Sequence, residues 1–226
     1  TGSLGQGLAI GVGMALAAKL QKRSYRTYVL MGDSECAEGS VWEALNLAVH
    51  YNLSHLSIIV DVNRLGQRGE TMFGHRLEEY VKRFQAFGWN VLTIDGHDMR
   101  EVQTALRSVS LSLRPTIILA KTFKGKGVSL MENKEGWHGK ALNEEQLIQA
   151  LHEVPEIPMP HVSIQPPRKH YVSRPKFAKP VFQQYSLEEQ VATREAYGQT
   201  LAALACADAR VIAVDAEVSN STHADS

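Results

Sequence analysis

The sequence has few cysteines, no net charge and no long apolar stretch. Its 226 residues include two cysteines, Cys36 and Cys206, which stand far apart and in no CxxC or CxxH spacing. This usage argues against a disulfide framework and a structural zinc site, and it is typical of a reducing, cytoplasmic environment. Lys plus Arg (24) balances Asp plus Glu (24). The chain therefore has no overall field to attract nucleic acid, and we expect no such partner.

Membrane signals are also missing from the sequence. No apolar run approaches the length of a membrane span, and no basic-then-apolar leader opens the chain. We therefore expect no membrane association. The chain opens on Thr1 in an apolar helical pattern and stops soon after an apparent strand at 211–214. These ends lead us to expect a piece of a longer protein.

Apolar patterning predicts strands that alternate with helices. Helices are expected at 8–20, 40–51, 77–87 and 99–108, and strands at 25–31, 56–60, 90–94 and 116–120. This alternation predicts an α/β fold, a parallel sheet flanked by helices. Active sites in such sheets lie at the carboxyl ends of the strands. The loops at 32–39, 61–70, 95–98 and 121–140 are therefore the candidates for a site.

A change of composition divides the chain. Seven of its eight prolines lie between residues 154 and 180, a density typical of an extended linker. Beyond it, a helix is expected at 187–204 and a strand at 211–214. We predict a first domain at 1–151, a linker at 152–186 and the start of a second α/β domain at 187–226.

Glycines near the start allow a dinucleotide-binding interpretation. Gly5, Gly7, Gly11 and Gly13 loosely imitate the glycine loop of such sites, and Asp33 at a strand end imitates the ribose-binding acid. That loop has to follow a strand and open a helix, and any such strand would lie before Thr1. Glycines in an alanine-rich helix more often allow close packing.

Polar groups follow two successive predicted strands. Asp33 comes after the strand at 25–31, and Asn63 and Leu65 come after the strand at 56–60. A carboxylate, an amide oxygen and a main-chain carbonyl suit Mg²⁺, which completes its shell with phosphate oxygens and water. Taken singly, Asp33 is explained as a capping residue and Asn63 as a turn residue. Together, at one sheet edge, they favour a metal–diphosphate site beside Gly32.

These groups resemble the thiamine-diphosphate fingerprint, GDG followed about thirty residues later by asparagine. Apart from the linker, the chain resembles transketolases in the strings GSLGQG (2–7), EGSVWEA (38–44), NRLGQ (63–67), AFGW (86–89), DGH (95–97), TFKG (122–125), WHGK (137–140) and ATR (192–194). The fingerprint occurs in many thiamine enzymes. The TFKG and WHGK strings are more specific to transketolases of the animal type, and they speak against a deoxyxylulose-phosphate synthase or a dehydrogenase first component.

The resemblance implies a role for each matching residue. Mg²⁺ would be held by Asp33, Asn63 and the carbonyl of Leu65. Thiamine diphosphate would be lined by Gly2, Ser3, Leu4, Ser34, Asn63, Lys124 and His138. Lys124 and His138 would also be catalytic and bind the sugar, together with Arg194 and Ser221, which would bind the sugar phosphate. Glu38 matches a position that couples two cofactor sites across a dimer.

The implied reaction moves a two-carbon ketol unit from a ketose phosphate to an aldose phosphate, in the pentose phosphate pathway. The implied assembly is a homodimer with active sites between subunits. The carbanion chemistry belongs to the cofactor. Arg194 suits a phosphate better than lysine would, and His138 is able to donate to a hydroxyl or a developing oxyanion near neutral pH.

Without the resemblance, simpler explanations apply to the same side chains. Lys124 would be an ordinary residue of a solvated basic loop, and Arg194 would pair with Glu189 or Glu195. Most other histidines are expected at the surface. For His97, which follows a predicted strand, the sequence gives no decision.

The chain departs from the family pattern at several points. Ser34 replaces the second glycine of the fingerprint, which would cost about 1 kcal/mol or more if that backbone needed a positive φ. Residues 215–217 read Asp-Ala-Glu instead of Asp-Gly-Asp. The family's activating glutamate and early histidines have no counterpart here, so this chain alone should not turn over substrate. Two functions stay open: a transketolase, or a catalytically impaired paralogue that acts as a binding or regulatory protein.

Overall fold

The computed structural model describes residues 2–158, 161–163, 177–215 and 217–224. The chain forms two compact units, Thr1–Pro158 and Met159–Ser226, which divide within the predicted linker. The domain limits expected from the sequence stay predictions. Across the described residues, no helix is both long enough and apolar enough to span a membrane.

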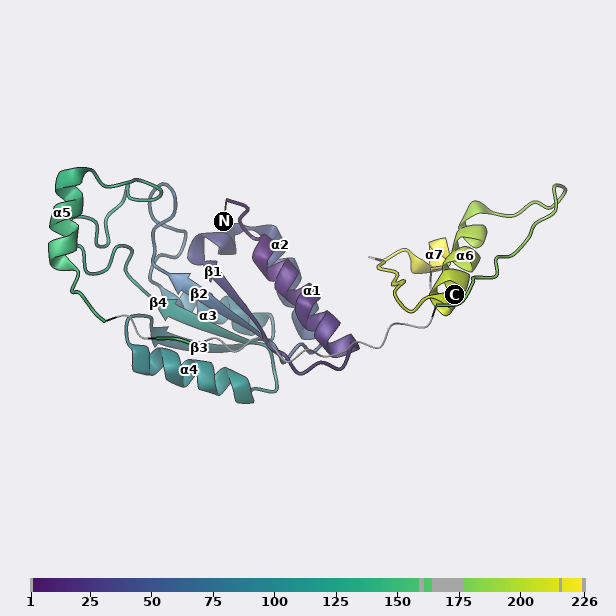
Figure 1. Ribbon diagram of the computed structural model, residues 1–226, viewed down its shortest axis with the longest axis horizontal. Helices are drawn as coiled ribbons and strands as arrows, with labels where there is room; N and C mark the ends of the chain where they lie inside the picture. Colours follow the sequence, from purple (N-terminus) through teal and green to yellow (C-terminus); the bar gives the residue numbers. More distant parts are fainter. Residues whose placement is uncertain (1, 159–160, 164–176, 216, 225–226) are drawn as a thin grey trace. The chain divides into compact units, whose positions relative to one another are not determined.

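The first unit is built on a parallel sheet (Figure 1). In space its strands follow the order β1 (Thr27–Gly32), β2 (Leu56–Val62), β4 (Thr116–Lys121) and β3 (Asn90–Asp95). Every neighbouring pair is parallel. The two central strands, β2 and β4, are buried along most of their length, which is why their sequences are almost continuously apolar. The predicted α/β fold is confirmed.

Helices cover the two faces of this sheet unequally. Helices α1 (Gln6–Leu20), α2 (Gly39–His50) and α3 (Leu77–Ala86) pack into one large core with β1, β2 and β4. Helix α4 (Met99–Leu111) lies on the opposite face, below the sheet in Figure 1, and packs through Ala105 and Val109 on Ile118. On that face of β1, Tyr28 and Leu30 stay exposed.

Two short elements were not expected from the sequence. A 3-10 helix, η1 (Asp33–Ala37), follows β1 directly, and α5 (Glu144–Glu153) follows the long loop after β4. Helix α5 starts in a capping box, because Asn143 Oδ1 accepts from the Gln146 amide and the Gln146 side chain accepts from the Asn143 amide. These two hydrogen bonds define where the loop after β4 ends and α5 begins.

The second unit differs from its prediction in two ways. Helix α6 (Thr193–Ala207) begins later than expected, and α7 (Ser219–Thr222) packs on it, with Gly198 against the backbone of His223. The predicted strand at 211–214 is wrong, because these residues lie in no strand. In the described part of this unit, β pairing is limited to an isolated bridge between Phe177 and Asp208. An apolar run without a neighbouring strand has no backbone partner for a ladder.

Candidate functional site

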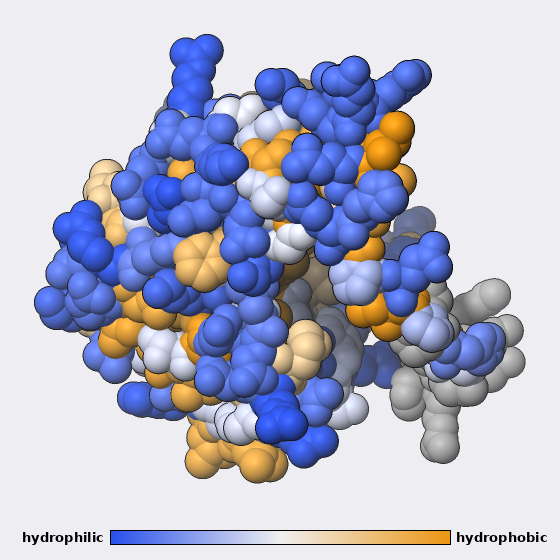
Figure 2. Space-filling view, turned by 90° about the vertical axis from the view of Figure 1, so that its left-hand side faces the viewer, coloured by the Kyte–Doolittle hydropathy of each residue, from blue (hydrophilic) through white to orange (hydrophobic). Residues whose placement is uncertain are grey.

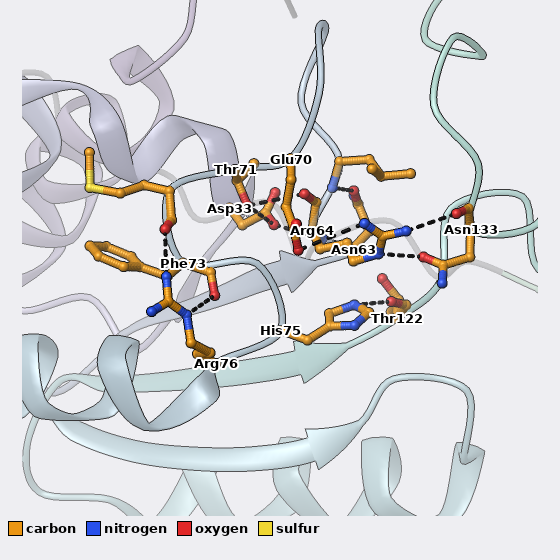
Figure 3. A network of polar contacts seen from close by, with 12 residues as sticks. Asp33, Asn63, Arg64, Glu70, Thr71, Phe73, His75, Arg76, Thr122 and Asn133 are labelled. Carbon is orange, nitrogen blue, oxygen red and sulfur yellow. Dashed lines mark hydrogen bonds and ion pairs between the residues drawn. The ribbon is translucent and has the colours of Figure 1, made fainter.

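Asp33 lies where β1 ends and η1 begins, at the carboxyl edge of the sheet (Figure 3). Its side chain is buried, with 3% of its surface exposed. Its Oδ2 accepts hydrogen bonds from the Arg64 amide at 2.8 Å and the Thr71 hydroxyl at 3.0 Å. Its Oδ1 is buried and has no hydrogen-bond partner among the described residues. Burial raises the pKa of Asp33, the charge of Asp61 adds to the rise, and the hydrogen bonds oppose it.

Asn63 lies beside this carboxylate, on the loop that follows β2. Its Nδ2 donates to Asp61 Oδ2 at 2.8 Å, and its Oδ1 accepts from the Leu65 amide at 3.0 Å. The other oxygen of Asp61 accepts from the Thr122 hydroxyl. Asp61 and Thr122 therefore fix the orientation of the Asn63 amide, and sequence reasoning gave neither of them a role.

The predicted magnesium set contains one carboxylate, so it differs from a cluster of acidic or histidine ligands. Within the described ranges, no group of three or more His, Cys, Asp or Glu side chains is placed to hold a metal. The donor chemistry nevertheless fits Mg²⁺, which needs few protein carboxylates when phosphate oxygens and water complete the shell. The buried Oδ1 of Asp33, which has no partner in the part of the chain that the structure describes, is the atom that such an ion would satisfy.

The segment before α1 is tied to the same edge by Glu35. One oxygen of its carboxylate accepts from the Gly5 amide at 3.1 Å, and the other accepts from the Gly32 amide at 2.9 Å. Gly5 has φ 78°, and a Cβ there would lie 2.7 Å from the Cβ of Glu38. Only glycine fits this close approach. Residues 2–4, predicted to line the cofactor, thus lead directly into a segment anchored to the fingerprint.

Ser34 is not strained. It lies in η1, and it is absent from the residues with positive φ, which include Arg64 and Asn133 but not the fingerprint. The backbone cost considered for a serine at this position therefore does not arise. Of the other departure, residues 215–217, Ala216 lies outside the described residues.

Lys124 and His138 come together across the loop that follows β4. The Lys124 ammonium lies 3.2 Å from His138 Nδ1. The two residues are fourteen positions apart, so this contact joins the TFKG and WHGK strings. The contact is exposed to solvent, so the role of Lys124 stays a prediction, as does its simpler explanation as a residue of a solvated basic loop.

Two further histidines contact the start of this loop, at Thr122 and Phe123. His97 Nε2 accepts from the Phe123 amide at 2.9 Å, and its ring stacks on the Phe123 ring. His75 Nε2 lies 2.9 Å from the Thr122 carbonyl oxygen (Figure 3). His97, undecided from the sequence, is thus an anchor for the start of the TFKG segment, and His75 was missed.

Arg194 and Ser221 belong to the second unit. Arg194 lies exposed in the first turn of α6, and Ser221 lies exposed in α7. Within the part of the chain that the structure describes, no ion pair joins Arg194 to Glu189 or Glu195. Their predicted contact with a sugar phosphate stays a prediction.

The sheet edge carrying these groups has a polar face. Figure 2 views the molecule from the side toward which the strand arrows of Figure 1 point, and this face is mainly hydrophilic, with apolar patches between. A cavity of about 210 Å³ opens beside Asp33 and Ser34, and its lining mixes polar side chains, Arg68, Glu70 and Thr71, with apolar ones, Met72, Phe73 and Tyr80.

One glycine of α1 serves close packing. Gly11 lies against Val29 so closely that an added Cβ would collide with the valine side chain, whereas a Cβ on Gly13 would meet nothing within 4 Å. The packing explanation is confirmed for Gly11, and Asp33, the supposed ribose-binding acid, instead accepts from Arg64 and Thr71.

Comparisons with known proteins identify the family to which the chain belongs. The family described as "Transketolase, thiamine diphosphate binding domain" matches residues 1–173. The chain is 42% identical to human transketolase and 44% identical to mouse transketolase-like protein 2, each over 98% of this chain and 36% of the relative. It therefore spans about a third of the length of these curated relatives.

Solved structures give the same answer. Transketolase from Campylobacter jejuni superposes with a TM-score of 0.61 at 37% identity, covering 66% of this chain and 24% of that one. A transketolase from Pichia stipitis in complex with sedoheptulose 7-phosphate superposes with a TM-score of 0.60 at 31% identity, covering 66% and 24%. By sequence and by fold, the chain belongs to the transketolase family.

Proposed function

We propose that this chain supplies the diphosphate- and magnesium-binding half of a transketolase active site. The protein would transfer a two-carbon ketol unit from a ketose phosphate to an aldose phosphate, in the pentose phosphate pathway. The observation that carries the proposal is the buried Oδ1 of Asp33, which is unpartnered among the described residues and lies at the edge where Asn63 and Leu65 also lie.

Asp33, Asn63 and the Leu65 carbonyl are the proposed ligands of Mg²⁺. Thr71 and the Arg64 amide hold one oxygen of Asp33, which leaves the other for the ion. Asp61 holds the Asn63 amide nitrogen, and Asn63 Oδ1, which accepts from the Leu65 amide, has a second lone pair for the ion. Gly2, Ser3, Leu4 and Ser34 are proposed to line thiamine diphosphate, which supplies the carbanion-stabilising thiazolium ring when bound.

Lys124 and His138 are the proposed catalytic pair. A protonated lysine is only a donor, so its contact at 3.2 Å makes His138 Nδ1 the acceptor. In neutral His138 the proton then resides on Nε2, which is able to donate to a sugar hydroxyl or to an oxygen that gains negative charge. Lys124 adds a fixed positive charge beside it, which favours the same developing anion.

The remaining features of the proposal concern the whole protein. Arg194 and Ser221 would bind the sugar phosphate, with the planar fork of arginine matching phosphate oxygens. Glu38, next to the segment of Gly5, would couple the two sites of a homodimer. The unpaired cysteines, Cys36 and Cys206, support a cytoplasmic location.

The test is calorimetric titration of thiamine diphosphate into the full-length protein, with and without Mg²⁺, followed by a turnover assay with xylulose 5-phosphate and ribose 5-phosphate. Magnesium-dependent binding and turnover are expected. His138→Ala should lower turnover far more than it weakens the binding of thiamine diphosphate, because most of the proposed cofactor contacts lie on other residues. A protein that binds no thiamine diphosphate at millimolar Mg²⁺ would refute the proposal.

A catalytically impaired paralogue acting as a binding or regulatory protein is the second candidate. It is motivated by Ser34 and by the similarity to a transketolase-like protein. Its signature would be cofactor binding without turnover, or binding restored only by Ser34→Gly. Because Ser34 carries no positive φ, we expect Ser34→Gly to change the affinity little, which favours the active enzyme.

A further inference from the structure

Arg64 belongs to the loop that follows β2, and it contacts the loop that follows β4, which carries Lys124 and His138 (Figure 3). Its main chain faces the first loop, because its amide donates to Asp33 Oδ2 at 2.8 Å and its carbonyl accepts from the Thr71 amide at 2.8 Å. Its side chain points the other way, toward Asn133. One residue therefore contacts both loops.

The contact to Asn133 is a two-pronged one. Arg64 Nε donates to Asn133 Oδ1 at 2.7 Å, and Nη2 donates to the Asn133 carbonyl oxygen at 2.9 Å. The two residues are 69 positions apart in the sequence. Charge-assisted, two-pronged bonds of this kind fix direction as well as distance, which a single lysine contact does not.

The connection continues from Asn133 to the catalytic pair. The Asn133 amide donates to the Lys124 carbonyl oxygen at 2.8 Å, and the Lys124 ammonium lies 3.2 Å from His138 Nδ1. A continuous series of contacts thus runs from Asp33 through Arg64 and Asn133 to Lys124 and His138.

The backbone at both ends of the arginine contact is unusual. Arg64 has φ 65° and Asn133 has φ 55°. Asparagine tolerates this left-handed region, whereas arginine has no local preference for it. Such a conformation persists only where surrounding contacts determine it, and it is concentrated at functional sites. The nearby Glu70 carboxylate, 3.7 Å from Arg64 Nη1 and 55% exposed, is too solvated to explain it.

We infer that Arg64 is a positioning residue: through Asn133 it sets the place of Lys124 and His138 relative to the Asp33 diphosphate site. This rests on the proposed function of that site. The side chain of Arg64 does not contact Asp33; only its backbone amide does. Replacing the side chain should therefore uncouple the catalytic pair and leave the cofactor site formed.

The experiment uses the full-length protein, four single variants and the double variant Arg64→Lys with Asn133→Gly. Arg64→Lys keeps the charge but loses the fork. Asn133→Gly keeps access to positive φ but removes the Oδ1 acceptor, whereas Asn133→Asp keeps an acceptor and adds charge. Lys134→Met is the matched control, because it removes a single exposed contact to the Ser129 carbonyl in the same loop.

Arg64→Lys and Asn133→Gly should each lower kcat about tenfold, because a misplaced catalytic group loses its attack geometry. The magnesium-dependent affinity for thiamine diphosphate should change less than about threefold, since the proposed metal and cofactor contacts outside the Lys124–His138 loop remain. The double variant should lose no more than either single one, because both remove one interaction. Asn133→Asp and Lys134→Met should stay within about twofold of the unaltered protein.

Hydrogen exchange provides a readout that does not need turnover. In Arg64→Lys, amides at 123–134 should exchange about tenfold faster, while those of β2 keep their rates. Unchanged kcat, or an equal loss of kcat and of thiamine diphosphate affinity, in an active protein would overturn the positioning role alone. If the unaltered protein neither binds thiamine diphosphate nor turns over, the proposed function fails. If the amides at 123–134 then also exchange at the same rate in Arg64→Lys as in the unaltered protein, the positioning role of Arg64 is overturned as well.

Discussion

Asp33→Asn separates the stability of the site from its ability to bind ligand. Asparagine keeps one oxygen, which is able to accept from the Arg64 amide and the Thr71 hydroxyl as Asp33 Oδ2 does. The substitution removes the charge of a buried carboxylate, one of whose oxygens lacks a partner among the described residues. A buried unsatisfied group costs about 1–3 kcal/mol, and the new amide nitrogen retains part of that cost. We therefore expect the ligand-free variant to be as stable as the unaltered protein, or more stable by up to about 2 kcal/mol.

With ligand the order should reverse. Thiamine diphosphate and Mg²⁺ present at about 100 times the dissociation constant stabilise a protein by about 2.7 kcal/mol. If the loss of the only predicted carboxylate ligand weakens binding about a hundredfold, the same concentration is near the new dissociation constant and stabilises by only about 0.4 kcal/mol. The ligand-induced gain should thus fall by about 2.3 kcal/mol.

The assay is denaturant unfolding of the full-length protein and the variant, each with and without both ligands. Asp95→Asn is the matched control, because Asp95 ends β3 at the same edge, is exposed, and accepts from the His97 amide through an oxygen that asparagine keeps. The control should retain the full ligand-induced gain. An equal gain in Asp33→Asn would refute the assignment of Asp33 as a metal ligand.

Two further predictions concern packing and thiol chemistry. Gly11→Ala should leave the protein about 1–3 kcal/mol less stable than Gly13→Ala, because both gain helix propensity but only the first collides with Val29; equal unfolding midpoints would contradict this packing. Alkylation followed by peptide mapping should modify exposed Cys206 in the native protein, whereas Cys36, whose pKa burial raises to about 12, should react only after unfolding. Labelling of native Cys36 at pH 8 would show that its surroundings open.

The sheet could be predicted from the sequence because the burial of each central strand is visible in the residues of that strand alone. The central strands β2 and β4 are buried on both faces, so their residues form unbroken apolar runs. Helices α2, α3 and α4 could be predicted because their apolar faces repeat at helical spacing, whereas α1 was predicted from its alanine-rich composition. Helix α5 was missed although Asn143 and Gln146 form a capping box visible in the sequence. Its apolar residues Leu147 and Leu151 are exposed in the structure, so the apolar pattern of this segment does not mark a buried face.

The ends of the strands also led to the site, but only to part of it. Asp33 and Asn63 were predicted to meet because parallel strands finish at one edge, and they lie on adjoining segments. The roles of Glu35 and Thr71 were not predictable, since each depends on a hydrogen bond between segments 30 or more positions apart. The strand expected at 211–214 failed for a related reason: an apolar run predicts burial, and only a partner makes it a strand.

The residues that escaped prediction are those in which local preference and tertiary structure disagree. Arg64 is a poor choice for a positive φ, and nothing in the residues around it predicts that its guanidinium is held by Asn133. Such disagreements are expected where a chain places chemistry ahead of local stability. Ser34, where the sequence suggested strain, has none. The strain therefore lies directly after the fingerprint's Asn63, on the residue that connects Asp33 to Lys124 and His138, and variants of Arg64 are a more informative probe of this active site than variants of Ser34.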